Sequence, residues 1–563
     1  MNQSINRNKS VHYFSILGIT LILFLAFMLL FTSLLLLCGV PIMGISLWLS
    51  VGLGLICLWG MARSFFPART GAMFFSILLG LAVVLGISWY VSAHTYDMSW
   101  DGQTYHQEAI ILLTDGWNPA HELLEAPSDT ELAKLQGREL LSVFHLWINH
   151  YSKGPWLLDS LLYKVTNQIE VSKIFNFILM FASFFLSVAA LLTAFPQSKR
   201  RAVLVSLLLA CNPVVFTQLI TFYIDGQLSS LILCLCALGY LLFQRFHPWL
   251  LVGLCAAIML LGNVKFTALV YAVLLSGGLL LLFYLYDRRR NWRKLAVTLA
   301  ACFFLSVVIV GYNPYVINTL TKAHPFYPLA GEQAVDIMTS NSPRDFLDKN
   351  QFEKLLISTF AMTANVANDG ESQWKLPFSV SPYEVAAFTA PDVRLGGFGP
   401  VFGGAVLISF IVFLGVCLCK RETVRPFFVI LGIFMISILI NPESWWARYV
   451  PQLWSIPLLI AVMGLESGKK WLQNGSRLLI CTLLANMLMV GLGHLAGQSY
   501  SHLLLKKQLH AMKQSNQPVL VDFRHFNSNR IRLQEAGIPF IEMKIDDQNA
   551  KGLSSSRTLY LIR

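Results

Sequence analysis

Two carboxylates lie close together just after a long apolar run. Asp97 and Asp101 are four residues apart, and the apolar run before them covers about residues 72–93. An apolar surface raises the pKa of a nearby carboxyl group, which suits that group to act as a general base. Three rings accompany the pair: Trp100, Tyr105 and His106. We interpret Asp101 as a candidate base, Asp97 as a carboxylate that orients or assists it, and the rings as part of a substrate cleft.

Both carboxylates also have structural interpretations, which the sequence leaves open. Asp101 precedes a segment that is compatible with a helix, and an Asp at that place would accept hydrogen bonds from the first backbone N–H groups as an N-cap. Asp97 would be a solvated acid in a loop. If both residues belong to one helix, a spacing of four places them on the same face. For Asp101, the roles of cap and base are compatible.

Two charged residues interrupt apolar regions that are each about two membrane spans long. Lys265 lies within residues 249–286, and Asp225 lies within residues 202–243. A charged side chain in hydrocarbon costs at least about 2.5–3.5 kcal/mol. We therefore expect both residues at turns near the membrane surface, where Lys265 would bind an anion and Asp225 would line the cleft.

An arginine between aromatic residues offers a further cation. Arg448 lies between Trp446 and Tyr449 and just before another apolar run. One interpretation is phosphate binding, because a guanidinium group contacts phosphate through parallel N–H groups. The structural alternative is that the rings belong to an aromatic belt at the membrane interface and that the arginine extends from this belt to the water. His324 is another candidate for the donor phosphate, and Trp446 and Tyr449 are candidates for the cleft. A base beside such cations suits transfer from a lipid-linked phosphate, because the base takes a proton from an acceptor hydroxyl while the cations stabilise the departing phosphate.

Membrane-spanning helices must position these residues. The 563 residues are 55% hydrophobic and only 13% charged, with a mean hydropathy of +0.60. Soluble domains carry about 25% charged residues. A span needs about 20 apolar residues, and the chain offers about 13 such runs. The net charge of +12 lies largely in short loops, where it reports membrane orientation, so we do not interpret it as a sign of nucleic-acid binding.

The basic loops predict the orientation of the chain. With a cytoplasmic N-terminus and alternating sides, every short basic loop falls inside: 63–69, 199–201, 245, 288–294, 420–425 and 469–477. The long polar loops 94–170 and 317–399, the Arg448 loop and the C-terminal tail then fall outside. This agrees with the excess of Lys and Arg expected in cytoplasmic loops. The sequence thus predicts a multi-pass protein with an extracytoplasmic C-terminus.

The predicted fold class is an all-α integral membrane protein with a small α/β domain at its C-terminus. Residues 1–70 form two additional N-terminal spans, residues 71–497 form the transmembrane core, and residues 498–563 form the α/β domain. The pattern at 156–163 predicts an amphipathic helix that lies on the bilayer surface. The ten cysteines lie within or at the edges of apolar runs, without neighbouring ligands, so no metal site is predicted.

Five short motifs carry the polar residues of the core: Trp-Asp-x-x-x-Tyr-His at 100–106, Tyr-Ile-Asp-Gly at 223–226, Lys-Phe-Thr at 265–267, His-Pro-Phe-Tyr-Pro at 324–328 and Arg-Tyr-Val-Pro at 448–451. Together they resemble the GT-C glycosyltransferases, a family of polytopic enzymes that includes bacterial aminoarabinose transferases and protein O-mannosyltransferases. The resemblance covers most of residues 72–460. It implies a catalytic acid in the first large outer loop, here Asp101 with Asp97 second. It also implies basic residues at the outer membrane edge that bind the donor phosphate, here Lys265 and Arg448.

The resemblance further implies a donor, an acceptor and a location. The donor is a polyprenyl-phosphate sugar, and an inverting transfer delivers the sugar to a glycan, lipid or protein on the outer side of a bacterial inner membrane. The spacing of the carboxylates departs from the tight acidic pair with which some members hold a metal, so the need for a divalent cation stays open. Two alternatives remain: an envelope polysaccharide polymerase or ligase, which would rely on an Arg–His pair, and a transporter, which would more often show repeated halves.

Overall fold

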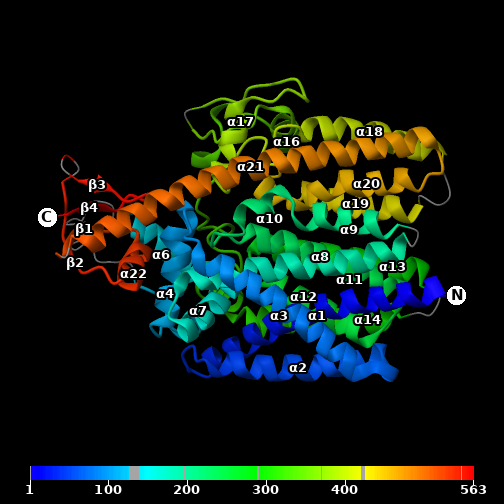
Figure 1. The fold of residues 1–563 in the computed structure, drawn as a ribbon, viewed down its shortest axis with the longest axis horizontal. Helices are drawn as coiled ribbons and strands as arrows, with labels where there is room; N and C mark the ends of the chain where they lie inside the picture. Colours follow the sequence, from blue (N-terminus) through cyan, green and yellow to red (C-terminus); the bar gives the residue numbers. More distant parts are fainter. Residues whose placement is uncertain are drawn as a thin grey trace.

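The computed structural model describes residues 2–125, 139–195, 198–287, 291–368, 370–419, 425–515, 517–546, 548 and 550–562. The basic residues that contribute to the predicted orientation but lie outside these ranges are Arg288, Arg289, Arg290, Lys420 and Arg421. The N-terminus lies at one end of the long axis and the C-terminus at the other (Figure 1). We call the end that carries the C-terminal sheet the domain end.

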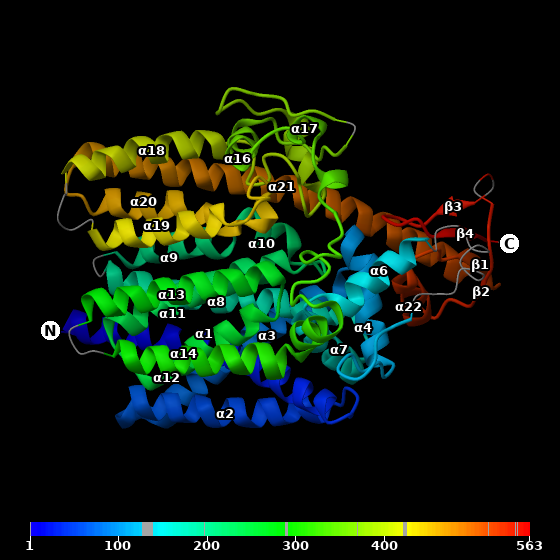
Figure 2. The same ribbon diagram turned by 180° about the vertical axis from the view of Figure 1, so that it is seen from behind.

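Long apolar helices make up most of the molecule (Figures 1 and 2). Their bounds are α1 (Asn2–Leu37), α2 (Ile45–Phe65), α3 (Thr70–His94), α8 (Ile174–Ala194), α11 (Asp225–Gln244), α12 (Pro248–Gly262), α13 (Phe266–Tyr286), α14 (Trp292–Phe304), α18 (Phe402–Cys419), α19 (Arg425–Leu439), α20 (Ser455–Leu465) and α21 (Lys470–Gln514). Within the described residues, nine helices are long and apolar enough to cross a membrane, and three shorter apolar helices accompany them. The expected all-helical multi-pass membrane fold is confirmed.

One predicted span is split into two short helices, α9 (Lys199–Ala210) and α10 (Pro213–Gln218). Pro213 has no backbone N–H to continue the helix, and the Asn212 side chain caps α10 by accepting a hydrogen bond of 3.1 Å from the backbone N–H of Val215. The chain then turns before α11. This turn places Asp225, the first residue of α11, at the domain end.

The bundle is centred on α8, which packs against α1 on one side and α11 on the other. Gly18 allows the close approach of α1, because a Cβ there would lie 2.6 Å from Leu186 Cγ. Helix α1 is largely buried, whereas α3 exposes most of its surface. The first helix of the predicted N-terminal addition, residues 1–70, is therefore part of the interior of the bundle.

The first long loop folds into short helices at the domain end: α4 (Gln107–Thr114), α6 (Glu139–His150) and α7 (Gly154–Thr166). Helix α7 packs against α4 and α1, and Trp156, Leu158 and Leu161 are at most 3% exposed. The prediction of a helix on the bilayer surface at 156–163 is therefore wrong. The apolar face exists, but other helices cover it instead of lipid.

The second long loop contains α15 (Ile317–Lys322), α16 (Gln351–Phe360) and α17 (Pro382–Ala386). Helices α16 and α17 both begin with a capping box, in which a side chain and the backbone exchange hydrogen bonds at the first turn. Helix α16 packs against α18, and α17 packs against α21. The loop is thus attached to two long helices at the side of the bundle (Figure 1).

A four-stranded sheet follows α21, with the order β2-β1-β4-β3. Its elements are β1 (Val519–Asp522), α22 (Asn527–Glu535), β2 (Phe540–Glu542), β3 (Lys551–Gly552) and β4 (Leu559–Leu561). Strand β1 pairs with β2 in parallel and with β4 in antiparallel orientation. Val519, Val521 and Leu533 pack on Leu505 and Leu509 of α21, so the last turns of this 45-residue helix form part of the core of the domain. The predicted boundary at residue 498 falls inside that helix.

Candidate active site

The guanidinium group of Arg448 is contacted by three carboxylates. Its Nη2 lies 3.2 Å from Asp101 Oδ2, its Nη1 lies 3.2 Å from Asp392 Oδ2, and its Nε lies 3.1 Å from Asp225 Oδ2. The three carboxylates come from the first long loop, the second long loop and the start of α11. We call Arg448, its three carboxylates and Lys265 the Arg448 cluster, which forms only when these distant segments fold together.

Lys265 joins the cluster through a shared carboxylate. Its Nζ lies 2.7 Å from Asp225 Oδ1. Asp225 is the first residue of α11, where its negative charge is favourable, whereas Lys265 precedes α13, where a positive charge is unfavourable. The ion pair offsets this cost and the burial of both charges. Two cations thus face three carboxylates, and the cluster carries one excess negative charge.

Aromatic rings enclose the two cations. The guanidinium carbon of Arg448 is 4.8, 5.0 and 5.6 Å from the ring centroids of Tyr223, Trp446 and Tyr449. The ring of Tyr449 also lies 4.2 Å from Lys265 Nζ. Contact of this kind stabilises a cation and restricts its position. Trp446 and Tyr449, which the sequence analysis assigns to the substrate cleft, thus both contact the Arg448 guanidinium.

Asp101 is the most accessible of the three carboxylates. Its side chain is 22% exposed, compared with 18% for Asp392 and 1% for Asp225. It makes no hydrogen bond that caps the following helix, so the N-cap interpretation is wrong. The hydroxyl of Tyr105 donates to its Oδ2 at 3.5 Å. Burial raises the pKa of Asp101 above its usual value, although the charge of Arg448 opposes the change. These properties suit a general base.

Asp97 lies apart from the cluster and is fully buried. Its Oδ1 accepts a hydrogen bond of 2.7 Å from the backbone of Ser99, and its Oδ2 accepts one of 2.9 Å from the backbone of Phe222. A Cβ at Gly102 would lie 1.8 Å from Asp97 Oδ2, so glycine is needed there. Because the helix begins at Trp100, after Asp97, the two predicted carboxylates do not share a helix face. Asp97 therefore fixes the backbone at Ser99, close to Asp101, and at Phe222, close to Asp225.

The three predicted rings of the first loop lie in different surroundings. His106 Nδ1 accepts a hydrogen bond of 2.7 Å from Trp156, and burial lowers the pKa of His106 to about 3, so the imidazole is neutral. The ring of Tyr105 is tilted against that of His106, with 4.3 Å between the centroids, and Tyr105 faces the cluster through its hydroxyl. Trp100 faces the C-terminal domain instead, where its ring lies 4.9 Å from the guanidinium carbon of Arg557.

His324 has only local contacts among those described for it. Its Nδ1 accepts a hydrogen bond of 3.2 Å from the backbone of Phe326. Phe326 packs on Phe266, the residue that follows Lys265, with 5.5 Å between the ring centroids. The motif around His324 therefore supports the Lys265 turn, but the structure does not bring the imidazole to Arg448.

Asp392 and Arg532 are absent from the predicted site residues. Asp392 comes from a polar loop, and nothing in its sequence context separates it from other loop acids. Arg532 of α22 donates through Nε and Nη2 to Glu170 Oε1 at 3.1 and 2.9 Å, and Glu170 also pairs with Lys173 at 2.5 Å. Glu170 and Lys173 stand at the start of an apolar run, where ionisable residues are rare. That rarity is a signal by which this second network could have been found.

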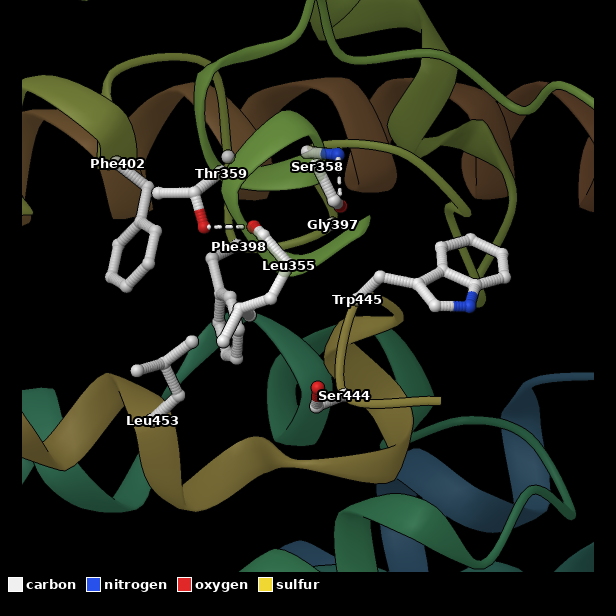
Figure 3. A pocket seen from close by; sticks show the side chains of 11 residues that line it. Leu355, Ser358, Thr359, Gly397, Phe398, Phe402, Ser444, Trp445 and Leu453 are labelled. Carbon is white, nitrogen blue, oxygen red and sulfur yellow. Dashed lines mark hydrogen bonds between the residues drawn. The ribbon is translucent and has the colours of Figure 1, made fainter. Parts of the chain in front are cut away.

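An open hollow of about 270 Å³ lies beside the Arg448 loop (Figure 3). Its walls come from α16, the turn at 396–399, the start of α18 and residues 444–445. The rings of Phe398 and Phe402 line it together with Leu453, which makes one side apolar. None of the five charged residues of the Arg448 cluster lines this hollow. It is therefore a neighbouring feature and not the place where these charges meet.

The carboxylates of the cluster are arranged around an arginine and not around a metal position. Across the described ranges, no group of three or more His, Cys, Asp or Glu side chains is placed to hold a metal ion. The three carboxylates of the cluster instead surround the Arg448 guanidinium. Arg448 thus occupies the position to which a cation would be attracted.

Fold and site together define a polytopic helical membrane protein with a charged cluster at the domain end. No family model matches the chain, and no curated protein matches it. Among solved structures, the chain is similar to ArnT from Cupriavidus metallidurans bound to undecaprenyl phosphate, with 14% sequence identity and a TM-score of 0.43. The similarity covers 84% of this chain and 86% of that chain. At this identity and TM-score, the assignment of a function depends on the site itself.

Proposed function

We propose that the protein is a membrane glycosyltransferase that moves a sugar from a polyprenyl-phosphate donor to an acceptor on the outer face of a bacterial inner membrane. The observation that carries this proposal is the contact between the accessible Asp101 carboxylate and the Arg448 guanidinium, with Lys265 held next to them by Asp225. A base and two phosphate-binding cations thus lie in one cluster. The acceptor is an envelope glycan, a lipid or a protein.

Arg448 has capacity for a further ligand. Its Nε is buried and has no hydrogen-bond partner among the described residues, although Asp225 lies within ion-pair distance. Each carboxylate contacts the guanidinium through a single oxygen at 3.1–3.2 Å. Bidentate contacts between a guanidinium and a phosphate are shorter and stronger than such contacts. A donor phosphate therefore competes well for Arg448.

The proposed step is a single displacement at the anomeric carbon. The acceptor hydroxyl oxygen forms a bond to this carbon while the bond from the carbon to the phosphate oxygen breaks, and the electron pair leaves with the phosphate. Asp101 accepts the hydroxyl proton. The leaving group is the polyprenyl phosphate, whose growing negative charge Arg448 and Lys265 stabilise. Attack from the side opposite the leaving group inverts the anomeric configuration.

The ion pair between Asp101 and Arg448 couples the proton uptake by Asp101 to the departure of the phosphate. When Asp101 takes up the proton, it becomes neutral and its attraction for Arg448 Nη2 falls. The departing phosphate gains negative charge at the same moment. Arg448 therefore exchanges a carboxylate partner for a phosphate partner, and the net charge of the buried site stays nearly constant. The raised pKa of Asp101 favours this proton transfer.

The alternative of a polysaccharide polymerase or ligase would use an Arg–His pair. In the described structure the partners of Arg448 are carboxylates and aromatic rings, and His106 is neutral and bound to Trp156. The geometry therefore favours the carboxylate-based transferase over an Arg–His mechanism.

Purified full-length protein in nanodiscs, supplied with a panel of polyprenyl-phosphate sugars and acceptor extracts, tests the proposal. We expect the release of polyprenyl phosphate by the wild type and its loss in Asp101→Asn at an unchanged unfolding temperature. Equal turnover by both proteins would leave a transferase that uses another base. If no donor turns over, and solute flux across proteoliposomes is observed instead, the protein is a transporter and the proposal fails.

A further inference from the structure

One segment of the second long loop exposes several large apolar side chains. Between Trp374 and Val380, four large apolar side chains are exposed: Trp374, Leu376, Phe378 and Val380. Leu376 is 78% exposed, and Tyr383, at the start of α17, is 83% exposed. A turn lies within the segment, because the backbone N–H of Ser379 donates to the carbonyl of Leu376 at 2.9 Å. We call the five exposed side chains Trp374, Leu376, Phe378, Val380 and Tyr383 the apolar row, and the exposure of such groups to water is unfavourable.

The charges of the same segment point inward. Lys375 lies between two of the exposed apolar residues, yet its side chain is only 11% exposed and forms an ion pair with Glu384, which is 2% exposed. The Lys375 ammonium also donates to the carbonyl of Pro400 at 2.5 Å. A loop in water has the opposite arrangement, with lysine outside and leucine inside. This inversion indicates that the apolar row meets an apolar medium.

The segment continues the exposed apolar surface of the long helices. The ring of Phe378 lies directly on α18, where a Cβ at Gly404 would be only 2.4 Å from it. Farther along α18, Phe410 and Ile411 are exposed, as expected of a helix that faces lipid. On the other side, the carbonyl of Val385 in α17 packs on Gly493 of α21.

Exposed residues of α21 border that contact as well: Leu492, Leu495 and Tyr500. In both views of the molecule, α16 and α17 lie beside the end of α18 that points toward the domain end and beside the middle of α21 (Figures 1 and 2). The apolar row thus adjoins the exposed apolar faces of these two helices.

We propose that residues 374–383, together with the exposed face of α16, lie in the interfacial region of the bilayer and bind its lipids. Phe352 and Leu356 supply the α16 part, with exposures of 65% and 54%. Aromatic and aliphatic side chains beside charges that point inward are what an interfacial segment requires. The occupant is the membrane itself, because the surface of the spans continues into the row. This assignment stands independently of the proposed transferase activity.

Membrane attachment has a consequence for the Arg448 cluster. Asp392 follows the attached segment by nine residues and contacts Arg448. Val385 and Thr389, which lie between them, pack on Gly493 and Gly497 of α21. The chain that leads to Asp392 is therefore held at its start by lipid, at residues 374–383, and farther along by α21, at Val385 and Thr389. The second long loop is held at the membrane and is not a free lid in the aqueous phase.

Depth-dependent fluorescence quenching tests this proposal on the full-length protein. An environment-sensitive fluorescent amino acid replaces Leu376, Tyr383 or, as a matched control, Ile541, which is 49% exposed on strand β2. The proteins are placed in nanodiscs of phosphatidylcholine and phosphatidylglycerol whose acyl chains carry a nitroxide near the headgroup. We expect several-fold stronger quenching at positions 376 and 383 than at position 541, with unfolding temperatures equal to that of the wild type.

Two results would overturn the proposal. Quenching at positions 376 and 383 that is no stronger than at position 541 would place the segment in water. Blue-shifted emission without nitroxide quenching would show that protein covers the row, either a second copy of the chain or another partner. The measurement needs no donor or acceptor, so its outcome is separate from that of the activity test.

Discussion

Arg448 and Arg532 are both buried, both contact carboxylates, and both lie near an aromatic ring, but their partners differ in kind. Arg532 is 1% exposed and directs two of its nitrogens to the single carboxylate of Glu170. It also donates to Gln103 Oε1 and to the carbonyl of Asp97. Arg448 divides its contacts among three separate carboxylates and keeps a buried Nε–H without a hydrogen bond in the described structure.

This difference indicates a structural role for Arg532, whose partners are fixed, and a binding role for Arg448, which can exchange a carboxylate for another anion. Arg532 donates through Nε and Nη2 to one oxygen of Glu170 and otherwise to neutral acceptors, so hydrogen bonds satisfy the whole guanidinium. Arg532 in this way fastens the C-terminal domain to the backbone around Asp97. Contacts through single oxygens to several charged groups are individually weaker, so an anion with two oxygens competes with them. The comparison predicts that variants of the first network mainly lower stability, whereas variants of the second mainly lower activity.

The largest expected effect is on catalysis at Asp101. Asp101→Asn removes the proton acceptor and should lower transferase activity about 10²–10⁴-fold, the range typical of a general base, with little change in unfolding temperature. Asp97→Asn is the matched control, because Asp97 accepts backbone hydrogen bonds through both oxygens. It should lower the unfolding temperature. If the two variants show the same profile in turnover and thermal unfolding, the assigned division of roles is wrong.

Arg532→Met removes the hydrogen bonds to Glu170 and Gln103, while Lys173 stays as a partner of Glu170. The free energy of unfolding should therefore fall, but by less than the loss of about 3–5 kcal/mol expected when a buried charge loses its only partner. Thermal unfolding in nanodiscs measures the change. Arg530→Met is a suitable control, because Arg530 is on the same helix and its ion pair with Glu542 is largely exposed. A loss of activity in Arg532→Met at unchanged stability would instead assign Arg532 to the reacting site.

Arg448→Lys keeps the positive charge but removes the fork of N–H groups. We expect transferase activity to fall about 10²–10³-fold, as when one donor to a developing oxyanion is removed. Stability should change little, because the ammonium still faces Asp225. Isothermal titration with polyprenyl phosphate in nanodiscs gives a second readout, in which the affinity of the variant should drop. Unchanged affinity would place the phosphate elsewhere.

The smallest effect is expected at Asp392. Its negative charge contributes to the raised pKa of Asp101, so Asp392→Asn should lower that pKa. A base works when deprotonated, and its activity is lost as the pH falls through its pKa. The acidic limb of the pH–rate profile should therefore move to lower pH in the variant, while activity at neutral pH falls by about tenfold or less. A shift to higher pH would contradict the arrangement of charges described for the cluster.

The sequence predicted the helices well because membrane spans are long and uniformly apolar, and because basic loops mark their ends. It also predicted Asp101, Lys265, Asp225 and Arg448, since charged residues beside or within apolar runs stand out. These four meet in the structure. The physical reason is that such charges need partners, and in a bundle the available partners are one another.

Other features depended on contacts that no local pattern records. The segment at 156–163 has the periodicity of a surface helix, and only the position of α1 shows that protein covers it. Asp97 is an aspartate in the same sequence neighbourhood as Asp101, but both of its carboxylate oxygens accept hydrogen bonds from the backbone, at Ser99 and Phe222. Asp392 reaches Arg448 through the fold of a long polar loop. Pairings between distant segments of this kind cannot be derived from spacing alone.

Helix α21 is continuous from the bundle to the C-terminal sheet, so its length sets the distance and the orientation of the sheet relative to the bundle. Its 45 residues extend for about 68 Å at 1.5 Å per residue, well beyond the hydrocarbon of a bilayer. Each residue added or removed beyond the membrane shifts the sheet by about 1.5 Å along the axis and turns it by about 100°. A single deletion there would swing α22 away from the first loop, and a deletion of seven residues would restore the angle but not the height. The phase of one helix thus decides whether Arg532 can reach Glu170.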